Sequence, residues 1–376
     1  MNLQDWGATL KVINPRSIRR AGTNMGQRTR AFWVHTNPIV DDPQKHIEEL
    51  AELGAEELFV LSIDGGGALY PSKSFVSTPS GKKRDMLGPL FKEAKKKGMK
   101  IHAWDVCFNK PNQELTKQKK EWFVVSRNGV SCVDKPPYVP DYLWLCPSQE
   151  EVRSFLLSGV QELAERYDLD GIHLDYIRLP DIFLPEQLRT QYGIKKGNDV
   201  YNPDYDFCYC PTCRSGFKKD YGIDPMEIEF GTRYWYQWVK WRADKITSFV
   251  RDFHKVVKSY DNTMETSAAV FATPGTSYRY VFQQWAEWPL DSLQPMIYHE
   301  YYDKGVEWIG EAVLEGVSTG KKILAGILLG FMKSDAEVKR SAEVALQKGA
   351  QGVCWFVYPI PKPEHKAALA EATRSI

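Results

Sequence analysis

The segment Asp170-Gly171-Ile172-His173-Leu174-Asp175-Tyr176-Ile177-Arg178-Leu179-Pro180 holds an apolar strand that carries charged side chains toward its end. Side chains of a strand alternate between its two faces, so Ile172 and Leu174 share one face and His173 and Asp175 share the other. A strand of this kind, with few polar positions, is typical of a parallel sheet that is covered on both faces. The polar residues His173 and Asp175 therefore indicate that a functional site lies at the end of this strand.

Seven further apolar runs of similar length lie before and after this segment, and helical patterns separate most of them. With this segment, the expected strands are Arg30–His35, Glu57–Ile63, Lys100–Phe108, Gly171–Leu179, Met264–Phe271, Ser292–Tyr298, Lys322–Leu329 and Gly352–Tyr358. The expected helices cover Pro43–Leu53, Asp85–Lys97, Ser148–Tyr167, Thr232–Tyr260, 303–316, 334–348 and Lys362–Ala372. Eight strand–helix units in this order predict a parallel (β/α)8 barrel, the TIM barrel, of the α/β class. A doubly wound open sheet is the alternative, but no GxGxxG follows the first strand.

Composition fits a single globular barrel over residues 1–376, with residues 181–230 as an insertion after the fourth strand. The 376 residues include 49 basic and 48 acidic ones, which argues against nucleic acid as a partner. No apolar window is long enough for a membrane span.

The first twenty residues lack the apolar stretch of a signal peptide. We therefore expect either a cytoplasmic protein or an exported one whose signal was removed, and the sequence does not decide between these two compartments.

In such barrels the functional groups lie at the carboxyl ends of the strands. The polar residues expected there are His35, Asp64, Asp105, Asp175 with Arg178, and Glu300. Arg178 could pair with Asp175 or with another carboxylate. Asp175 is then either a catalytic carboxylate or one half of a buried ion pair that closes the top of the barrel.

Several motifs around the fourth strand resemble the glycosyl-hydrolase-like family 10 proteins. The matching residues are His102-Ala103-Trp104, Glu121-Trp122, Asn128-Gly129, Trp144-Leu145, the helix start Glu150-Glu151-Val152-Arg153, and the run from Arg166 to Asp175. The likeness is close over about residues 30–180 and extends beyond them only in layout. It implies a barrel glycosidase that acts on an oligosaccharide or polysaccharide, with Asp175 as the leading catalytic candidate.

Glycosidases generally use two carboxyl groups, and the sequence offers several partners for Asp175. Glu300 follows the sixth strand and is the first choice, as the acid/base, with Asp175 as nucleophile or charge stabiliser. Asp105 on the third strand is the second choice, and Asp64 also lies near a strand end.

Aromatic residues are abundant, with 12 Trp and 19 Tyr, and sugar rings stack on such side chains. The expected substrate-binding residues are His35, Asp64, Trp104, His173, Arg178, Tyr298 and Trp355. A barrel that binds carbohydrate without cleaving it would keep the same aromatic surfaces, so it remains the alternative. A metal-dependent hydrolase would need histidine ligands on several strands, and the seven His are scattered instead.

The insertion contains Cys208, Cys210 and Cys213, a CxCxxC spacing that suits zinc if one more ligand is supplied. Together with the helix start Cys146-Pro147-Ser148, this spacing resembles the zinc site of the family-42 β-galactosidases. The resemblance implies Cys146, Cys208, Cys210 and Cys213 as ligands of a structural zinc, with no catalytic metal. Three reduced thiols without a metal are the other interpretation.

Overall fold

The computed structural model describes residues 28–197 and 199–376, so the N-terminal segment considered for a signal peptide lies outside the described residues. Eight parallel strands close into a barrel because β1 pairs with both β9 and β2. The barrel strands are β1 (Thr29–Val34), β2 (Glu57–Asp64), β4 (Lys100–Val106), β5 (Gly171–Asp175), β6 (Glu265–Phe271), β7 (Ser292–Met296), β8 (Leu324–Leu328) and β9 (Gly352–Tyr358). A short strand β3 (Gly67–Ala68) pairs antiparallel with the end of β2. The predicted TIM barrel is confirmed.

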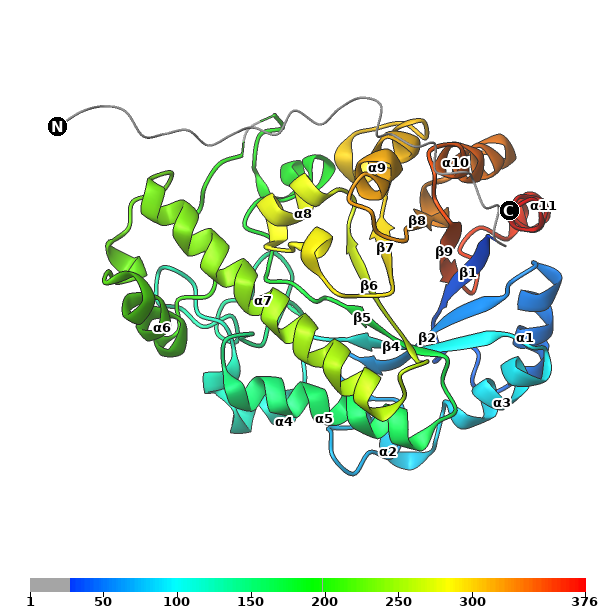
Figure 1. The fold of residues 1–376 in the computed structure, drawn as a ribbon, viewed down its shortest axis with the longest axis horizontal. Helices are drawn as coiled ribbons and strands as arrows, with labels where there is room; N and C mark the ends of the chain where they lie inside the picture. The colour runs from blue at the N-terminus through cyan, green and yellow to red at the C-terminus, as the bar shows by residue number, and fades with distance from the viewer. Residues whose placement is uncertain (1–27, 198) are drawn as a thin grey trace, which may run out of the picture.

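Helices surround this barrel (Figure 1). They are α1 (Pro43–Glu52), α2 (Pro79–Lys83), α3 (Gly88–Lys96), α4 (Gln113–Gln118), α5 (Glu150–Arg166), α6 (Pro211–Tyr221), α7 (Arg233–Tyr260), α8 (Pro274–Val281), α9 (Trp308–Val317), α10 (Asp335–Gln347) and α11 (Lys366–Arg374). Short 3₁₀ helices span Lys120–Trp122, Glu186–Tyr192, Pro225–Glu227, Trp285–Glu287, His299–Tyr302, Leu329–Phe331 and Pro363–His365. Among the described residues, no helix combines the length and the apolar character that crossing a membrane would require.

The strand β5 is shorter than predicted. The expected range was Gly171–Leu179, but β5 ends at Asp175. Tyr176 has a φ of 50°, in the left-handed region, and this conformation cannot continue a strand. Arg178 therefore lies in the loop that follows β5, three residues before the insertion begins at residue 181.

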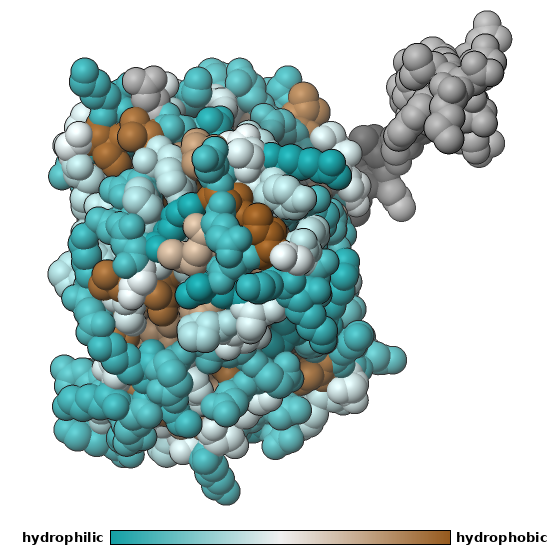
Figure 2. Space-filling view, turned by 90° about the vertical axis from the view of Figure 1, so that its left-hand side faces the viewer, coloured by the Kyte–Doolittle hydropathy of each residue, from teal (hydrophilic) through white to brown (hydrophobic). Residues whose placement is uncertain are grey.

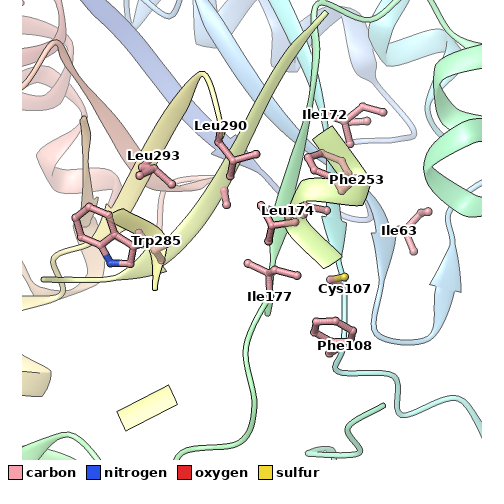
Figure 3. Packing of buried hydrophobic residues seen from close by; sticks show 14 of the residues in the cluster. Ile63, Cys107, Phe108, Ile172, Leu174, Ile177, Phe253, Trp285, Leu290 and Leu293 are labelled. Atoms are coloured by element: carbon pink, nitrogen blue, oxygen red, sulfur yellow. The ribbon is translucent and has the colours of Figure 1, made fainter. Parts of the chain in front are cut away.

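The two faces of β5 have the roles that the alternation predicted. Ile172 and Leu174 belong to the large apolar cluster between the strands and the outer helices, which includes Phe253 of α7 (Figure 3). His173 faces the barrel interior, where its ring lies 4.5 Å from the ring of Phe59. The outer layer thus holds β5 in place and leaves its inner face for polar groups.

The structure adds α2, α4, α6 and α8 to the helices that were expected. Of these, α6 and α8 begin with proline at the first helical position, directly after Cys210 and Thr273. Thr273 also caps α8 by accepting a hydrogen bond from the backbone N–H of Thr276. These start signals are present in the sequence, but each helix is short and weakly periodic.

The long helix α7 follows the insertion, and its first half lies beside α6 at the left of the molecule (Figure 1). Trp238 and Trp241 of α7 both pack against Phe217 of α6, at ring distances of 5.0 and 6.2 Å. The surface on this side is mostly hydrophilic with small separate hydrophobic patches (Figure 2). The tryptophans of α7 therefore serve as core for the insertion.

Candidate active site

A cavity of about 520 Å³ opens at the carboxyl ends of the barrel strands. Its walls are largely aromatic, and the aromatic lining residues are Trp33, His35, Trp104, Tyr142, Tyr176, Phe271, Tyr298, Tyr301, Tyr302 and Phe356. Three charged residues, Asp175, Arg178 and Asp181, also line it. This composition, apolar walls with a few polar groups, is that of a ligand pocket.

Asp175 is the last residue of β5 and is almost entirely buried at this cavity. Its Oδ1 accepts a hydrogen bond of 2.7 Å from the backbone N–H of Tyr176, and its Oδ2 accepts one of 3.2 Å from Nε1 of Trp104. Burial outweighs these two donors and the nearby Arg178, and it raises the pKa of Asp175 to about 6. The carboxyl group can therefore exchange a proton close to neutral pH.

Arg178 does not hydrogen-bond to Asp175; its Nη1 donates to Oδ2 of Asp181 at 2.8 Å. The guanidinium also lies over the rings of Trp144, Tyr176 and Phe271, each about 5 Å away. The sequence left open whether Arg178 pairs with Asp175 or with another carboxylate, and in the structure it pairs with Asp181. Asp181, which we did not single out from the sequence, is the second carboxylate in the cavity lining.

His35 and Trp104 form one stacked wall of the cavity, with ring centroids 5.6 Å apart. Burial lowers the pKa of His35, which keeps its imidazole neutral at neutral pH. Tyr298 also lines the cavity. The structure thus brings His35, Trp104, Asp175, Arg178 and Tyr298 together at one pocket.

His173 lies one layer below this pocket rather than in its wall. Its Nε2 accepts a hydrogen bond of 3.0 Å from Nε1 of Trp33, and its Nδ1 lies 2.9 Å from Oγ of Ser267. Burial lowers the pKa of His173 well below its ordinary value, so the ring is neutral. Its contact with the cavity is indirect, through the Trp33 indole that it orients.

Trp355, which we expected to bind substrate, does not line the cavity. It is fully buried in the outer apolar cluster, on the face of β9 that packs against the helices. The cavity is lined instead by its neighbour Phe356. A difference of one residue along a strand exchanges the two faces, and the sequence pattern of this apolar strand does not determine which face is inside.

The expected partners of Asp175 are also placed elsewhere. Glu300 lies in the 3₁₀ helix His299–Tyr302, where Oε1 is 2.6 Å from Nζ of Lys333, and it is not among the residues that line the cavity. Asp105 is buried on the opposite face of β4 from Trp104, with Oδ1 3.7 Å from Nζ of Lys110. The structure thus brings neither residue to the cavity.

Asp64 is likewise outside the cavity lining, because its side chain stabilises its own turn. Its Oδ1 accepts hydrogen bonds of 2.8 and 3.0 Å from the backbone N–H groups of Gly66 and Gly67. Gly67 has a φ of 134°, and a Cβ there would lie 2.5 Å from the carbonyl oxygen of Val76. The Asp-Gly-Gly-Gly stretch is therefore a tight turn leading into β3.

The four cysteines of the expected metal site lie together and are buried. Sγ of Cys146 is 3.4 Å from Sγ of Cys213 and 3.7 Å from Sγ of Cys210. Four thiolates around tetrahedral zinc at about 2.3 Å would have sulfur–sulfur distances of about 3.8 Å. The cluster is compatible with a bound metal ion, and it joins the start of α5 to the start of α6.

A closed parallel barrel with a pocket at the carboxyl ends of its strands makes this chain a TIM-barrel protein. Solved structures support the fold. The chain aligns with the PgaB (BpsB) glycoside hydrolase domain from Bordetella bronchiseptica at a TM-score of 0.67 and 14% identity, covering 92% of this chain and 98% of that one. A β-galactosidase from Bacillus circulans sp. alkalophilus aligns at a TM-score of 0.65 and 11% identity, over 93% of this chain and 56% of the other.

The sequence profile described as "Glycosyl hydrolase-like 10" matches residues 28–340, and the chain belongs to this family. Glycosyl hydrolase DigH of Escherichia coli O6:H1 is 26% identical over 339 residues, which cover 82% of this chain and 69% of DigH. Glycosyl hydrolase YngK of Bacillus subtilis is 23% identical over 195 residues, 46% of this chain and 36% of YngK. The resemblance that the motifs around β5 indicated is thereby confirmed.

Proposed function

We propose that this protein is a glycosidase that cleaves O-glycosidic bonds in an oligosaccharide or polysaccharide. Its described residues, 28–197 and 199–376, would form one catalytic barrel domain with the insertion 181–230 within it. The observation that carries the proposal is Asp175, a buried carboxyl group at an aromatic pocket with its pKa raised to about 6. Carboxyl groups that are protonated near neutral pH in such pockets act as general acids in glycoside hydrolysis.

Asp175 is the proton donor to the leaving-group oxygen in this mechanism. The reaction requires a group that keeps a proton until the glycosidic bond begins to break, and burial provides this property. The Trp104 indole and the Tyr176 amide then stabilise the carboxylate that remains, since both donate hydrogen bonds to it. This assignment differs from the role of nucleophile or charge stabiliser that we expected from the sequence, because it rests on the raised pKa.

Asp181 takes the place of Glu300 and Asp105 as the second carboxyl group. It lines the same cavity as Asp175, and its Oδ2 accepts a hydrogen bond of 2.8 Å from Nη1 of Arg178. An ionised carboxylate can either attack the anomeric carbon or activate water for that attack.

The aromatic walls support a sugar ligand. Pyranose faces stack on indole and phenol rings, and the stacked His35–Trp104 pair offers such a surface beside Asp175. Neutral His35 can exchange hydrogen bonds with sugar hydroxyls.

The four-cysteine cluster is proposed to hold a structural zinc. A site of four thiolate ligands has no open position for water, so it would contribute to folding and not to the reaction. The ion would link Cys146, just before α5, with Cys208 and Cys210 in the loop before α6 and with Cys213 in its first turn.

The test is hydrolysis of a panel of aryl α- and β-glycosides and oligosaccharides by the parent protein and by the Asp175→Asn variant. Glu300→Gln is the matched control, because it makes the same carboxyl-to-amide change at a site outside the cavity lining. Hydrolysis that is lost only in Asp175→Asn supports the proposal. Binding of a sugar without turnover by the parent would favour the non-catalytic barrel, and equal turnover by all three proteins would remove Asp175 from the mechanism.

A further inference from the structure

A second cluster of potential ligands lies at the opposite end of the barrel from the pocket. Glu57 is the first residue of β2, His102 is the third of β4, and Glu265 is the first of β6. One ligand atom from each of these residues lies within 4.8 Å of the others. These strand starts form the floor of the barrel, and we call the three residues the floor cluster.

Buried polar atoms in the floor cluster lack hydrogen-bond partners within the described part of the chain. These atoms are both ring nitrogens of His102, Oε1 of Glu57 and Oε2 of Glu265. His102 is 0% exposed and Glu57 is 3% exposed. Nε2 of His102 and Oε1 of Glu57 are 3.1 Å apart and therefore contact each other. This contact still leaves Nδ1 of His102 and Oε2 of Glu265 without a hydrogen-bond partner among the described residues. Buried polar groups are normally satisfied, so this grouping calls for a further partner.

The backbone makes room for the imidazole at this position. His102 pairs in register with Gly171 of β5, and Gly171 pairs with Glu265 of β6. A Cβ on residue 171 would lie 2.2 Å from Nδ1 of His102. The absence of a side chain at Gly171 thus lets the ring lie between β4 and β6, beside both carboxylates.

From this geometry we propose that the floor cluster is a binding site for a divalent transition-metal ion of the manganese or zinc type, ligated by Glu57, His102 and Glu265. Mixed imidazole and carboxylate ligands suit these ions. Two carboxylates with a neutral imidazole carry the charge that balances a divalent cation. The ion would tie β2, β4 and β6 together far from the pocket, so its role is structural and independent of the proposed glycosidase activity.

Two lysines compete with the ion for Glu265. Nζ of Lys100 is 3.0 Å from Oε1 of Glu265, and Nζ of Lys322 is 3.8 Å from Oε2. The two lysine side chains are 53% and 38% exposed. They can turn outward into solvent when the ion binds, and Glu265, which is also partly exposed, provides the entry path.

The experiment is a titration of the chelator-treated full chain with Mn²⁺, followed by the electron paramagnetic resonance signal of free Mn²⁺. Mn²⁺ prefers oxygen and imidazole ligands to thiolates, so the four-cysteine cluster does not take it up. We expect one tight site per chain in the parent and at least tenfold weaker binding in Glu265→Gln and in His102→Gln. Asp168→Asn is the matched control, because Asp168 is a 90% exposed carboxylate near the same barrel end and outside the cluster.

Glu265→Gln decides the outcome, because the partly exposed position lets this variant fold even if His102→Gln does not. Thermal unfolding gives a second measurement, since a ligand that binds only the folded state raises the Tm as its concentration increases. Mn²⁺ should raise the Tm of the parent and of Asp168→Asn, and leave that of Glu265→Gln unchanged. A parent that binds no Mn²⁺ tightly, or a Glu265→Gln variant that titrates like the parent, would overturn the proposal.

Discussion

Nε1 of Trp104 donates a hydrogen bond to Oδ2 of Asp175 across the adjacent strands β4 and β5. The register of the two strands pairs Trp104 with His173 and Val106 with Asp175, so the indole reaches toward the strand end to meet the carboxyl group. An aromatic wall residue and the candidate acid are therefore fixed relative to each other by the sheet itself. A sugar that stacks on the indole would present its ring close to the carboxyl group.

The raised pKa of Asp175 makes protein stability depend on pH in a defined direction. The folded state holds the proton up to pH about 6, whereas the unfolded chain releases it near 3.8, so this contribution to stability is present below pH about 4 and is lost as the pH rises through about 6. Asn cannot ionise. The free energy of unfolding of Asp175→Asn, relative to the parent, should therefore rise between pH about 4 and about 7, by up to ~3 kcal/mol.

Urea denaturation of both proteins across that pH range measures this difference. Asp168→Asn is a control, because the carboxylate it removes is almost fully exposed. A difference between Asp175→Asn and the parent that stays constant with pH would show that the carboxyl group titrates as it does in the unfolded chain.

The neutral imidazole of His173 should carry its proton on Nδ1. Nε2 accepts the Trp33 N–H, so the remaining proton is available for the Ser267 hydroxyl. We expect ¹⁵N chemical shifts that report this tautomer unchanged from pH 5 to 8, since burial lowers the pKa well below its usual range. A ring that titrates within this interval, or one protonated on Nε2, would contradict the arrangement.

The Arg178–Asp181 ion pair is buried at the cavity, with side chains 7% and 5% exposed. Removing one partner leaves an unpaired charge, so Arg178→Met and Asp181→Asn should each destabilise the fold by about 3–5 kcal/mol. The double variant should lose clearly less than the sum of the two. Chemical denaturation of the four proteins measures the coupling, and strictly additive losses would mean that the two charges do not interact.

The four-cysteine cluster should hold about one zinc per chain in protein purified without chelator. Cys146→Ser should lose the metal and lower the Tm, because the ion contributes to folding. Cys354→Ala, a buried cysteine outside the cluster, serves as the control. Elemental analysis measures the zinc content of each variant, and thermal unfolding measures its Tm. Equal zinc content in both variants would point to a different binding site.

Strand order and strand polarity followed from the sequence because the apolar runs and helical periods are local and regular. The end of β5 did not, because the left-handed conformation of Tyr176 is imposed by the surrounding structure and not by a glycine. Asp175, Trp104 and His35 could be placed at the pocket from their positions near strand ends. Side chains alternate between the two faces of a strand, so the direction of each of these side chains follows once the inner face of the strand is known.

The presence of Asp181 in the cavity lining, beside Asp175, could not be predicted in the same way. Glu300 and Asp181 both lie in the connections that follow strand ends, and which of them reaches the cavity depends on the path that each connection takes. The spacing of Arg178 and Asp181, three residues apart in an otherwise apolar run, was the available signal. Trp355 and Phe356 show the same limit on a strand, because both neighbours are aromatic and only tertiary packing decides which one faces inward.

The role of Asp175 as the proton donor is tested by comparing leaving groups in the Asp175→Asn variant. A residue that donates the proton matters most when the leaving group is poor, as in an alkyl glycoside or a natural oligosaccharide, and little when it is an acidic phenol. For a substrate that the parent cleaves, kcat/KM of Asp175→Asn should fall by about 10²–10⁴-fold with the poor leaving group and far less with the dinitrophenyl glycoside of the same sugar. Equal losses with both leaving groups would contradict the assignment of Asp175 as the acid.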